Sequence, residues 1–128
     1  MSYTLNRTFP DATMADIDTR TRAALADQGF GVLTEIDVKA TLKKKIDVDV
    51  EPYVILGACN PKMAHHAIGM EPHIGVMLPC NVIVRQVGKD VEVSAVDPMA
   101  AFAPIGNAAL EPVAAEVRDM LQAAVDAI

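Results

Sequence analysis

The sequence predicts a single α+β domain over residues 1–128, with an antiparallel sheet of four to five strands and helices packed on one face. Two observations indicate this class. Apolar and polar residues alternate in several short segments, and stretches of helical periodicity separate those segments and end the chain. A length of 128 residues with 52% hydrophobic residues is sufficient for one core.

The N-terminal segment is expected to form a strand followed by a helix. Residues 3–8 alternate in character, and Pro10 would end the strand because proline has no N–H to donate to the sheet. Thr13 is a suitable N-cap, and apolar residues then recur at helical spacing as far as Leu25. Gly29 would end this helix, because glycine adopts the left-handed conformation without steric cost.

The next segments alternate between strands and short helices. Residues 30–37 predict a second strand, and Asp37 is placed to cap a short helix that ends in three lysines. Residues 46–51 are interpreted as a linker. Residues 53–57 predict a buried strand, and Pro61 then lies in the first turn of a further helix.

The C-terminal half is expected to contain a hairpin and a long helix. The apolar segment at residues 74–87 predicts a strand in which Pro79 causes a bulge or marks an edge position. A turn at residues 88–90 leads into an antiparallel partner strand. Residues 98–105 predict an apolar loop, and a final amphipathic helix begins near Pro112.

The charge balance argues against two classes of partner. Seventeen acidic and eleven basic residues give a net charge of -6, so we expect neither nucleic acid nor an anionic membrane surface to bind. No segment approaches the roughly 20 apolar residues that span a bilayer, and the first residues do not resemble a leader, so we expect a cytoplasmic protein. In that reducing compartment the two cysteines should be free thiols.

The most informative pattern is a repeated Cys-Asn pair. Cys59-Asn60 follows a predicted strand and precedes a proline, whereas Cys80-Asn81 follows Pro79 inside an apolar segment. At such irregular positions the backbone leaves the sheet ladder, and side chains become available to a cleft. Glu71 also precedes a proline and is positioned to face that cleft. The candidate ligand-binding residues are therefore Cys59, Asn60, Cys80, Asn81 and Glu71.

Several longer motifs carry a resemblance to a known family. They are GFGVLTEIDVKATL at residues 29–42, YVILGACNP at residues 53–61, Glu71-Pro72, Ile74-Gly75, LPCNV at residues 78–82 and Asp97-Pro98. Together they cover most of the chain and resemble the family called domain of unknown function 302. The resemblance implies a β-α-β(4)-α order similar to the TATA-box-binding-protein-like class of folds, often as a homodimer, with no established reaction or cofactor. It assigns no role to the motif positions, which are Cys59, Asn60, Pro61, Glu71, Pro79, Cys80, Asn81 and Asp97.

The two cysteines admit three interpretations, and the sequence leaves all of them open. They fit buried core positions, since cysteine is among the residues most often found inside proteins. They also fit a redox or nucleophilic site, because Cys59 lies just before a helix N-terminus, where the helix dipole favours an anion. A soft-metal site for copper or zinc is the third, with His65, His66 or His73 completing the ligand set.

The sequence thus predicts a small cytoplasmic protein with a ligand or thiol-redox site built from the two Cys-Asn elements, and it leaves open whether the protein is an enzyme. The alternatives are a copper or zinc binding protein and a non-catalytic homodimeric interaction module. The module would use the apolar surface near residues 102–105 and the last helix. A second copy of the chain and a small molecule are the expected partners.

Overall fold

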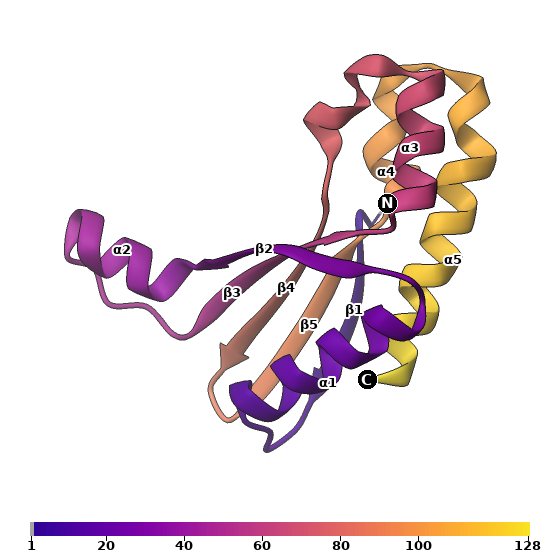
Figure 1. Cartoon of the computed structure of the whole chain (residues 1–128). Coiled ribbons are helices and arrows are strands. Elements are labelled where there is room, and N and C mark those ends of the chain that lie inside the picture. The colour runs from indigo at the N-terminus through magenta and orange to yellow at the C-terminus, as the bar shows by residue number, and fades with distance from the viewer. Residues whose placement is uncertain (1) are drawn as a thin grey trace.

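The computed structural model describes residues 2–128 and arranges them around one five-stranded sheet (Figure 1). The strands are β1 (Thr4–Phe9), β2 (Gly31–Asp37), β3 (Tyr53–Cys59), β4 (Cys80–Val87) and β5 (Asp90–Val96). They lie in the order β1-β5-β4-β3-β2, and every neighbouring pair is antiparallel. The predicted fold class and the β-α-β(4)-α order are confirmed, with shorter helices inserted between strands.

Two long helices cover one face of this sheet. The helices are α1 (Met14–Asp27), α2 (Val38–Ile46), α3 (Pro61–Met70), α4 (Pro98–Phe102) and α5 (Glu111–Ala127), with 3-10 turns at Pro72–Met77, Ala103–Ile105 and Ala108–Leu110. Helix α1 contacts β2, β4 and β5, and α5 contacts β1 and β5 as well as α1. Within residues 2–128, none of the helices combines the length and the apolar character that crossing a bilayer requires.

Strand pleating explains why only one face is covered. Leu5, Ala95, Val82 and Leu56 are register partners across β1, β5, β4 and β3, and all four are buried. Successive residues of a strand point to opposite faces, so the adjacent row points away from α1 and α5. In that row Ile83 is only half-buried. The hydrophobic core therefore lies between the sheet and the two long helices.

The helix boundaries follow from local capping. The Thr13 hydroxyl accepts the Asp16 N–H at 3.2 Å at the start of α1, and an Asp37 carboxylate oxygen accepts the Ala40 N–H at 2.9 Å at the start of α2. Both N-caps are as the sequence predicts. Gly29 follows α1 with φ of 83°, the left-handed conformation in which glycine has no steric penalty.

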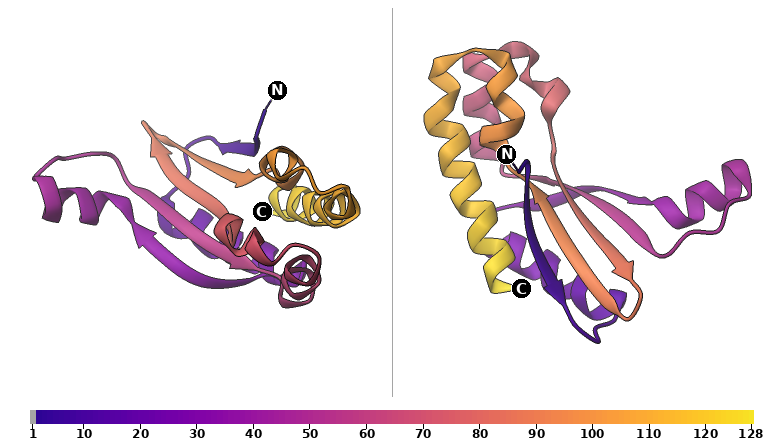
Figure 2. Two further views of the ribbon diagram at one scale, coloured as in Figure 1. Left: turned by 90° about the horizontal axis from the view of Figure 1, so that it is seen from above. Right: turned by 180° about the vertical axis from the view of Figure 1, so that it is seen from behind.

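Helix α2 projects away from the rest of the molecule. It connects the outer ends of β2 and β3 and has no buried residue. Figures 1 and 2 show this projection from three directions. We call residues 33–53, which contain the outer parts of the two strands and α2, the arm. Residues 47–52 within it have no regular structure, so the predicted linker is confirmed, except that Ile46 belongs to α2.

The prediction for Pro79 was wrong. Pro79 lies outside the ladder, β4 begins only at Cys80, and β4 is an inner strand rather than an edge strand. The preceding residues Pro72–Met77 form a 3-10 turn instead of continuing the strand. A proline lacks the N–H that an inner strand must donate on one side, so it is tolerated before the strand and not within it. The irregularity of the sheet lies on β2, between Val32 and Thr34.

The loop predicted at residues 98–105 is also corrected. Pro98 begins the short helix α4, and a carboxylate oxygen of Asp97 accepts the Met99 N–H at 2.9 Å. An N-cap aspartate followed by proline at the first helical position is a helix start signal. The other carboxylate oxygen of Asp97 accepts the Arg118 Nε–H at 3.1 Å, which attaches α4 to α5.

Candidate functional site

A small cavity lies where the end of β3 and the start of β4 meet α3, α4 and α5. Its volume is about 30 Å³, and no charged side chain borders it. The residues around it include Phe30, Cys59, Met63, Cys80, Phe102 and Val117. We call it the sulfur pocket, because both cysteines of the chain and Met63 border it.

The two thiols of the sulfur pocket have different environments. Cys80 is 7% exposed, and burial, with a smaller contribution from Cys59, raises the pKa of its thiol to about 11. Cys80 therefore stays protonated at neutral pH and is a poor nucleophile there. Cys59 is half-buried. The two residues are not register partners, since Ala58 is opposite Cys80, and both thiols are free.

The two asparagines of the Cys-Asn elements are not brought together at this cavity. Asn60 borders the sulfur pocket, and its Oδ1 accepts the Met63 N–H at 3.3 Å, so its side chain caps α3. Asn81 is exposed on β4, in register with Gly57 on β3, and does not border the pocket.

Glu71 lies at the junction of α3 and the following 3-10 turn and does not itself border the sulfur pocket. Its Oε1 accepts the Nδ2–H of Asn107 at 3.4 Å, and its Oε2 is 4.0 Å from Nδ1 of His73. Asn107 Nδ2 also donates to the Met70 carbonyl at 3.3 Å. Glu71 thus connects the end of α3 to the segment before α5. Of the five predicted ligand-binding residues, Cys59, Asn60 and Cys80 border one cavity.

The histidines do not extend the donor set of the pocket. His65 and His66 are exposed on α3, His73 is 96% exposed at its side chain, and none of them borders the sulfur pocket. Across residues 2–128, no group of three or more His, Cys, Asp and Glu residues is arranged to hold a metal ion. The third soft donor beside the two thiols is the thioether of Met63.

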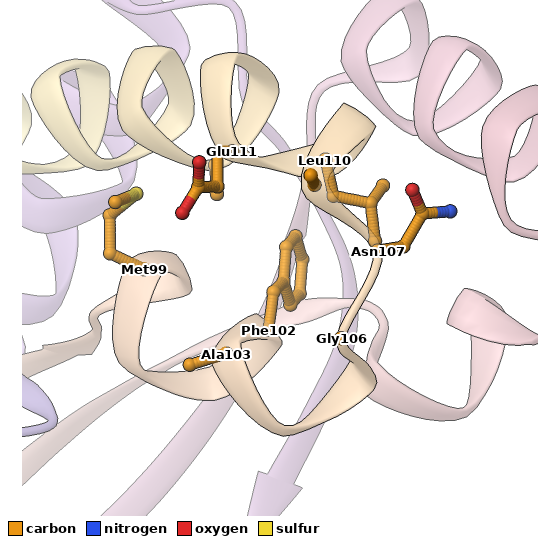
Figure 3. A pocket seen from close by; sticks show the side chains of 9 residues that line it. Met99, Phe102, Ala103, Gly106, Asn107, Leu110 and Glu111 are labelled. Carbon is orange, nitrogen blue, oxygen red and sulfur yellow. The ribbon is translucent and has the colours of Figure 1, made fainter.

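A second and larger cavity opens between α4 and the start of α5 (Figure 3). Its volume is about 370 Å³, and we call it the α4–α5 groove. The residues that define it include Met99, Phe102, Ala103, Asn107, Leu110 and Glu111. Phe102 also borders the sulfur pocket, so its side chain forms part of the wall between the two cavities.

Sequence reasoning found the apolar character of this region but not the groove itself. Residues 102–105 were predicted to be an apolar surface, whereas Asn107 and Glu111 follow the segment and carried no motif. The Asp97-Pro98 pair could have predicted the start of α4, because aspartate at the N-cap followed by proline is a helix start signal. A helix at this position is followed by a turn before α5, and the groove lies between the two helices.

The chain matches one known family and a solved structure of the same family. The family is described as "Domain of unknown function DUF302", and the match spans residues 5–128. The solved structure is the crystal structure of the uncharacterized conserved protein DUF302 from Bacillus stearothermophilus, which is 28% identical in sequence with a TM-score of 0.87. The comparison covers 95% of this chain and 96% of that chain. No curated protein matches the chain.

Proposed function

Because the chain belongs to the DUF302 family, whose description gives no activity, we propose its function from the site alone: the protein binds a small ligand at the sulfur pocket through the thiol of Cys59. The observation that supports this proposal is that both cysteines border one cavity, where Cys80 is buried and Cys59 is only half-buried. Two free thiols also fit a protein of the reducing cytoplasm.

The environment of the two thiols supports a division of roles. Cys59 ends β3 immediately before Asn60, the N-cap of α3, so a ligand on its sulfur would lie near the first turn of that helix. The N-terminal end of a helix favours negative charge, which includes a thiolate or a thiolate-bound ligand. Cys80 serves as the buried neighbour, because a thiol with a pKa of about 11 does not compete as a nucleophile at neutral pH.

Thiol modification under native conditions tests this proposal. We expect an aromatic disulfide reagent to modify Cys59 rapidly and Cys80 only as fast as the protein unfolds. The Cys59→Ala variant should lose the rapid phase, and the Cys80→Ala variant should keep it. Rapid modification of Cys80, or no modification of either thiol before unfolding, would contradict a ligand site at Cys59.

Met63 favours a soft metal as the ligand of this pocket. A buried water needs two to four polar partners, and the pocket offers thiols, a thioether and an asparagine whose Oδ1 is already engaged in the cap. Thiolate and thioether donors select monovalent copper over hard cations. In this variant of the proposal Cys59, Cys80 and Met63 would bind Cu(I), and no histidine takes part.

Copper retention tests the metal variant separately from thiol reactivity. Reduced protein loaded with Cu(I) should retain the metal against a weak chelator, and both Cys59→Ala and Met63→Leu should lose it. His73→Ala is the control and should retain it, because His73 is 96% exposed and outside the pocket. An equal loss of copper from all three mutant proteins would exclude Cu(I) binding at the sulfur pocket. It would not contradict the proposed thiol site at Cys59.

The arm supports a second candidate function, which is self-association as a homodimeric interaction module. Large hydrophobic side chains are exposed along it, and they are Leu33, Ile36, Ile46 and Val48, with exposed fractions of 69%, 47%, 61% and 41%. A projecting helix without a buried residue has little to stabilise it within one chain. Exposed apolar surface of this kind is typical of protein interfaces.

The mass of the protein in solution tests self-association. Sedimentation or light scattering should give the mass of a dimer, and Ile36→Glu should shift the protein to the monomer. Ile68→Glu on α3 is a matched control, since Ile68 is 43% exposed but lies outside the arm. A monomer at all concentrations, or an equal effect of the two variants, would exclude the arm as the interface.

A further inference from the structure

We propose that the α4–α5 groove binds an organic cation with a short apolar body, such as an alkylammonium ion. The groove volume of about 370 Å³ falls in the range of roughly 300–1,000 Å³ that small-molecule sites occupy. This binding site is independent of the thiol chemistry proposed above, because neither cysteine borders the groove.

The charge of the groove determines whether it favours a positively or a negatively charged ligand. Glu111 is the only charged side chain that borders it, and Glu111 makes no ion pair within residues 2–128. The only basic residue of α5 is Arg118, whose guanidinium is bound to Asp97 at 3.1 Å. A ligand in the groove therefore meets a carboxylate that has no side-chain counterion, and only the N-terminal end of the α5 dipole partly offsets its charge.

The hydrogen-bonding groups of the groove point to the same conclusion. Asn107 is the other polar side chain that borders it. Its Nδ2 donates to the Met70 carbonyl and to Glu71, and its Oδ1 accepts the Ala109 N–H at 3.1 Å. No side-chain donor of the groove is left for an anion, whereas the Glu111 carboxylate is available to a cation.

The apolar residues of the groove suit the body of such a cation. Figure 3 shows the Met99 side chain and the Glu111 carboxylate on the left of the view, and the ring of Phe102 to their right, towards Leu110. An aromatic ring attracts a cation placed over its face, and a thioether adapts its shape to an alkyl chain. The remaining groove side chains are small or aliphatic, for example Ala103 and Leu110.

A set of three probes with the same alkyl chain tests the proposal. The probes are n-hexyltrimethylammonium, n-hexanol and n-hexanesulfonate, each titrated at fixed ionic strength while backbone amide NMR shifts are recorded. We expect the cation to bind most tightly, hexanol more weakly and the sulfonate least, with the largest shifts in residues 98–114. Equal binding of cation and sulfonate, or shifts centred elsewhere, would overturn the proposal.

Matched charge variants give the second measurement. Glu111→Gln should weaken binding of the cation by about fivefold, the effect of about 1 kcal/mol from one partly exposed charge pair, and should leave hexanol binding unchanged. Glu116→Gln, an exposed position on the same helix outside the groove, should change neither. The same loss in both variants would show a general effect of net charge and contradict a site at Glu111.

Discussion

The Cys80 thiol shows how burial converts an ordinary side chain into a pH-dependent element of stability. Its pKa rises from 9.0 to about 11, first because burial disfavours the thiolate and second because of a smaller electrostatic contribution from Cys59. A raised folded-state pKa means that the folded protein holds this proton more tightly than the unfolded chain does. The contribution is fully present below pH 9 and is lost as the pH rises towards 11.

We therefore predict that stability falls between pH 9 and 11 because of Cys80. A shift of two pKa units corresponds to about 3 kcal/mol, which is an upper limit for the change. Urea unfolding at closely spaced pH values should give a steeper decline for the native sequence than for Cys80→Ala. Cys59→Ala is the control and should keep most of the slope. Parallel curves for the native sequence and Cys80→Ala would show that the thiol is not buried in solution.

Position 57 requires glycine because neighbouring residues lie too close for a side chain, and not because of its backbone angles. A Cβ at this position would overlap Oγ1 of Thr34 and would lie 2.7 Å from Cγ of Pro79. The missing side chain therefore allows β2 and the residue before β4 to close over β3.

We predict that Gly57→Ala destabilises the protein by about 1–3 kcal/mol, the usual cost of overpacking. Adding Thr34→Ala should recover part of the loss, because one of the two overlapping atoms is then removed. Gly69→Ala is the control, since nothing lies within 4 Å of its Cβ position in α3, and it should be neutral or stabilising. Thermal unfolding of the four proteins decides the matter, and a neutral Gly57→Ala would contradict the close approach.

At the scale of elements, α2 depends on its own sequence more than on packing. It has nine residues and buries none of them, while isolated helices shorter than about 12–15 residues are marginal in water. Its local support consists of the Asp37 cap, the Lys39 Nζ–H donated to the Val50 carbonyl at 2.8 Å, and the Lys43 ion pair with Asp47 at 2.8 Å.

We predict that Asp37→Ala unfolds α2 locally while the rest of the protein stays folded. Loss of an N-cap costs about 1 kcal/mol, which is large for a helix that has no core contacts. Amide exchange in residues 38–46 should accelerate several-fold, and the global melting temperature should change little. Thr13→Ala is the control: α1 buries Ile17 and Leu25, so loss of that cap should lower global stability instead. Protection of residues 38–46 that survives the change would show that α2 is held by other contacts, including a second chain.

The elements that sequence reasoning predicted well are those with local signals. Such signals depend only on residues close together in the sequence. The structure confirms the caps Thr13 and Asp37 and the periodicity of α5. Pro79 was placed wrongly because its position depends on which strands become inner strands, and that is decided by pairing of β4 with both β3 and β5.

The site was only partly predictable for the same reason. Cys59 and Cys80 border one cavity because β3 pairs with β4, a neighbour relation that the sequence allowed but did not specify. The Asn60 side chain caps α3, and this role is consistent with its position immediately before Pro61. The role of Phe102 as a shared wall depends on how α4 and α5 pack, and no pattern in one segment contains that information.

At the scale of the whole molecule, the N-terminal strand and the C-terminal helix hold each other. The last carbonyl groups of a helix have no partner within it, and the last turn of α5 contains no basic residue. Arg7 on β1 supplies the missing donors from across the fold, and Arg20 on α1 donates to the Ile128 carbonyl at 3.1 Å. Both guanidinium groups lie over the ring of Phe9, at 4.7 and 5.3 Å from its centre.

We predict that Arg7→Met lowers the free energy of unfolding by about 2 kcal/mol. Methionine keeps the apolar stem but leaves the Asp126 carbonyl without a donor, and the carbonyls of Val125 and Ile128 each lose one of their two donors. Urea unfolding should show a lower midpoint at unchanged slope, as expected when stability and not compactness changes. Arg22→Met is the matched control: its partners are an exposed carboxylate and a half-buried one, and such surface pairs contribute about 0–1 kcal/mol. If the two variants lose the same stability, the contact between β1 and the end of α5 is no more than a surface interaction, and these termini are held together by apolar packing alone.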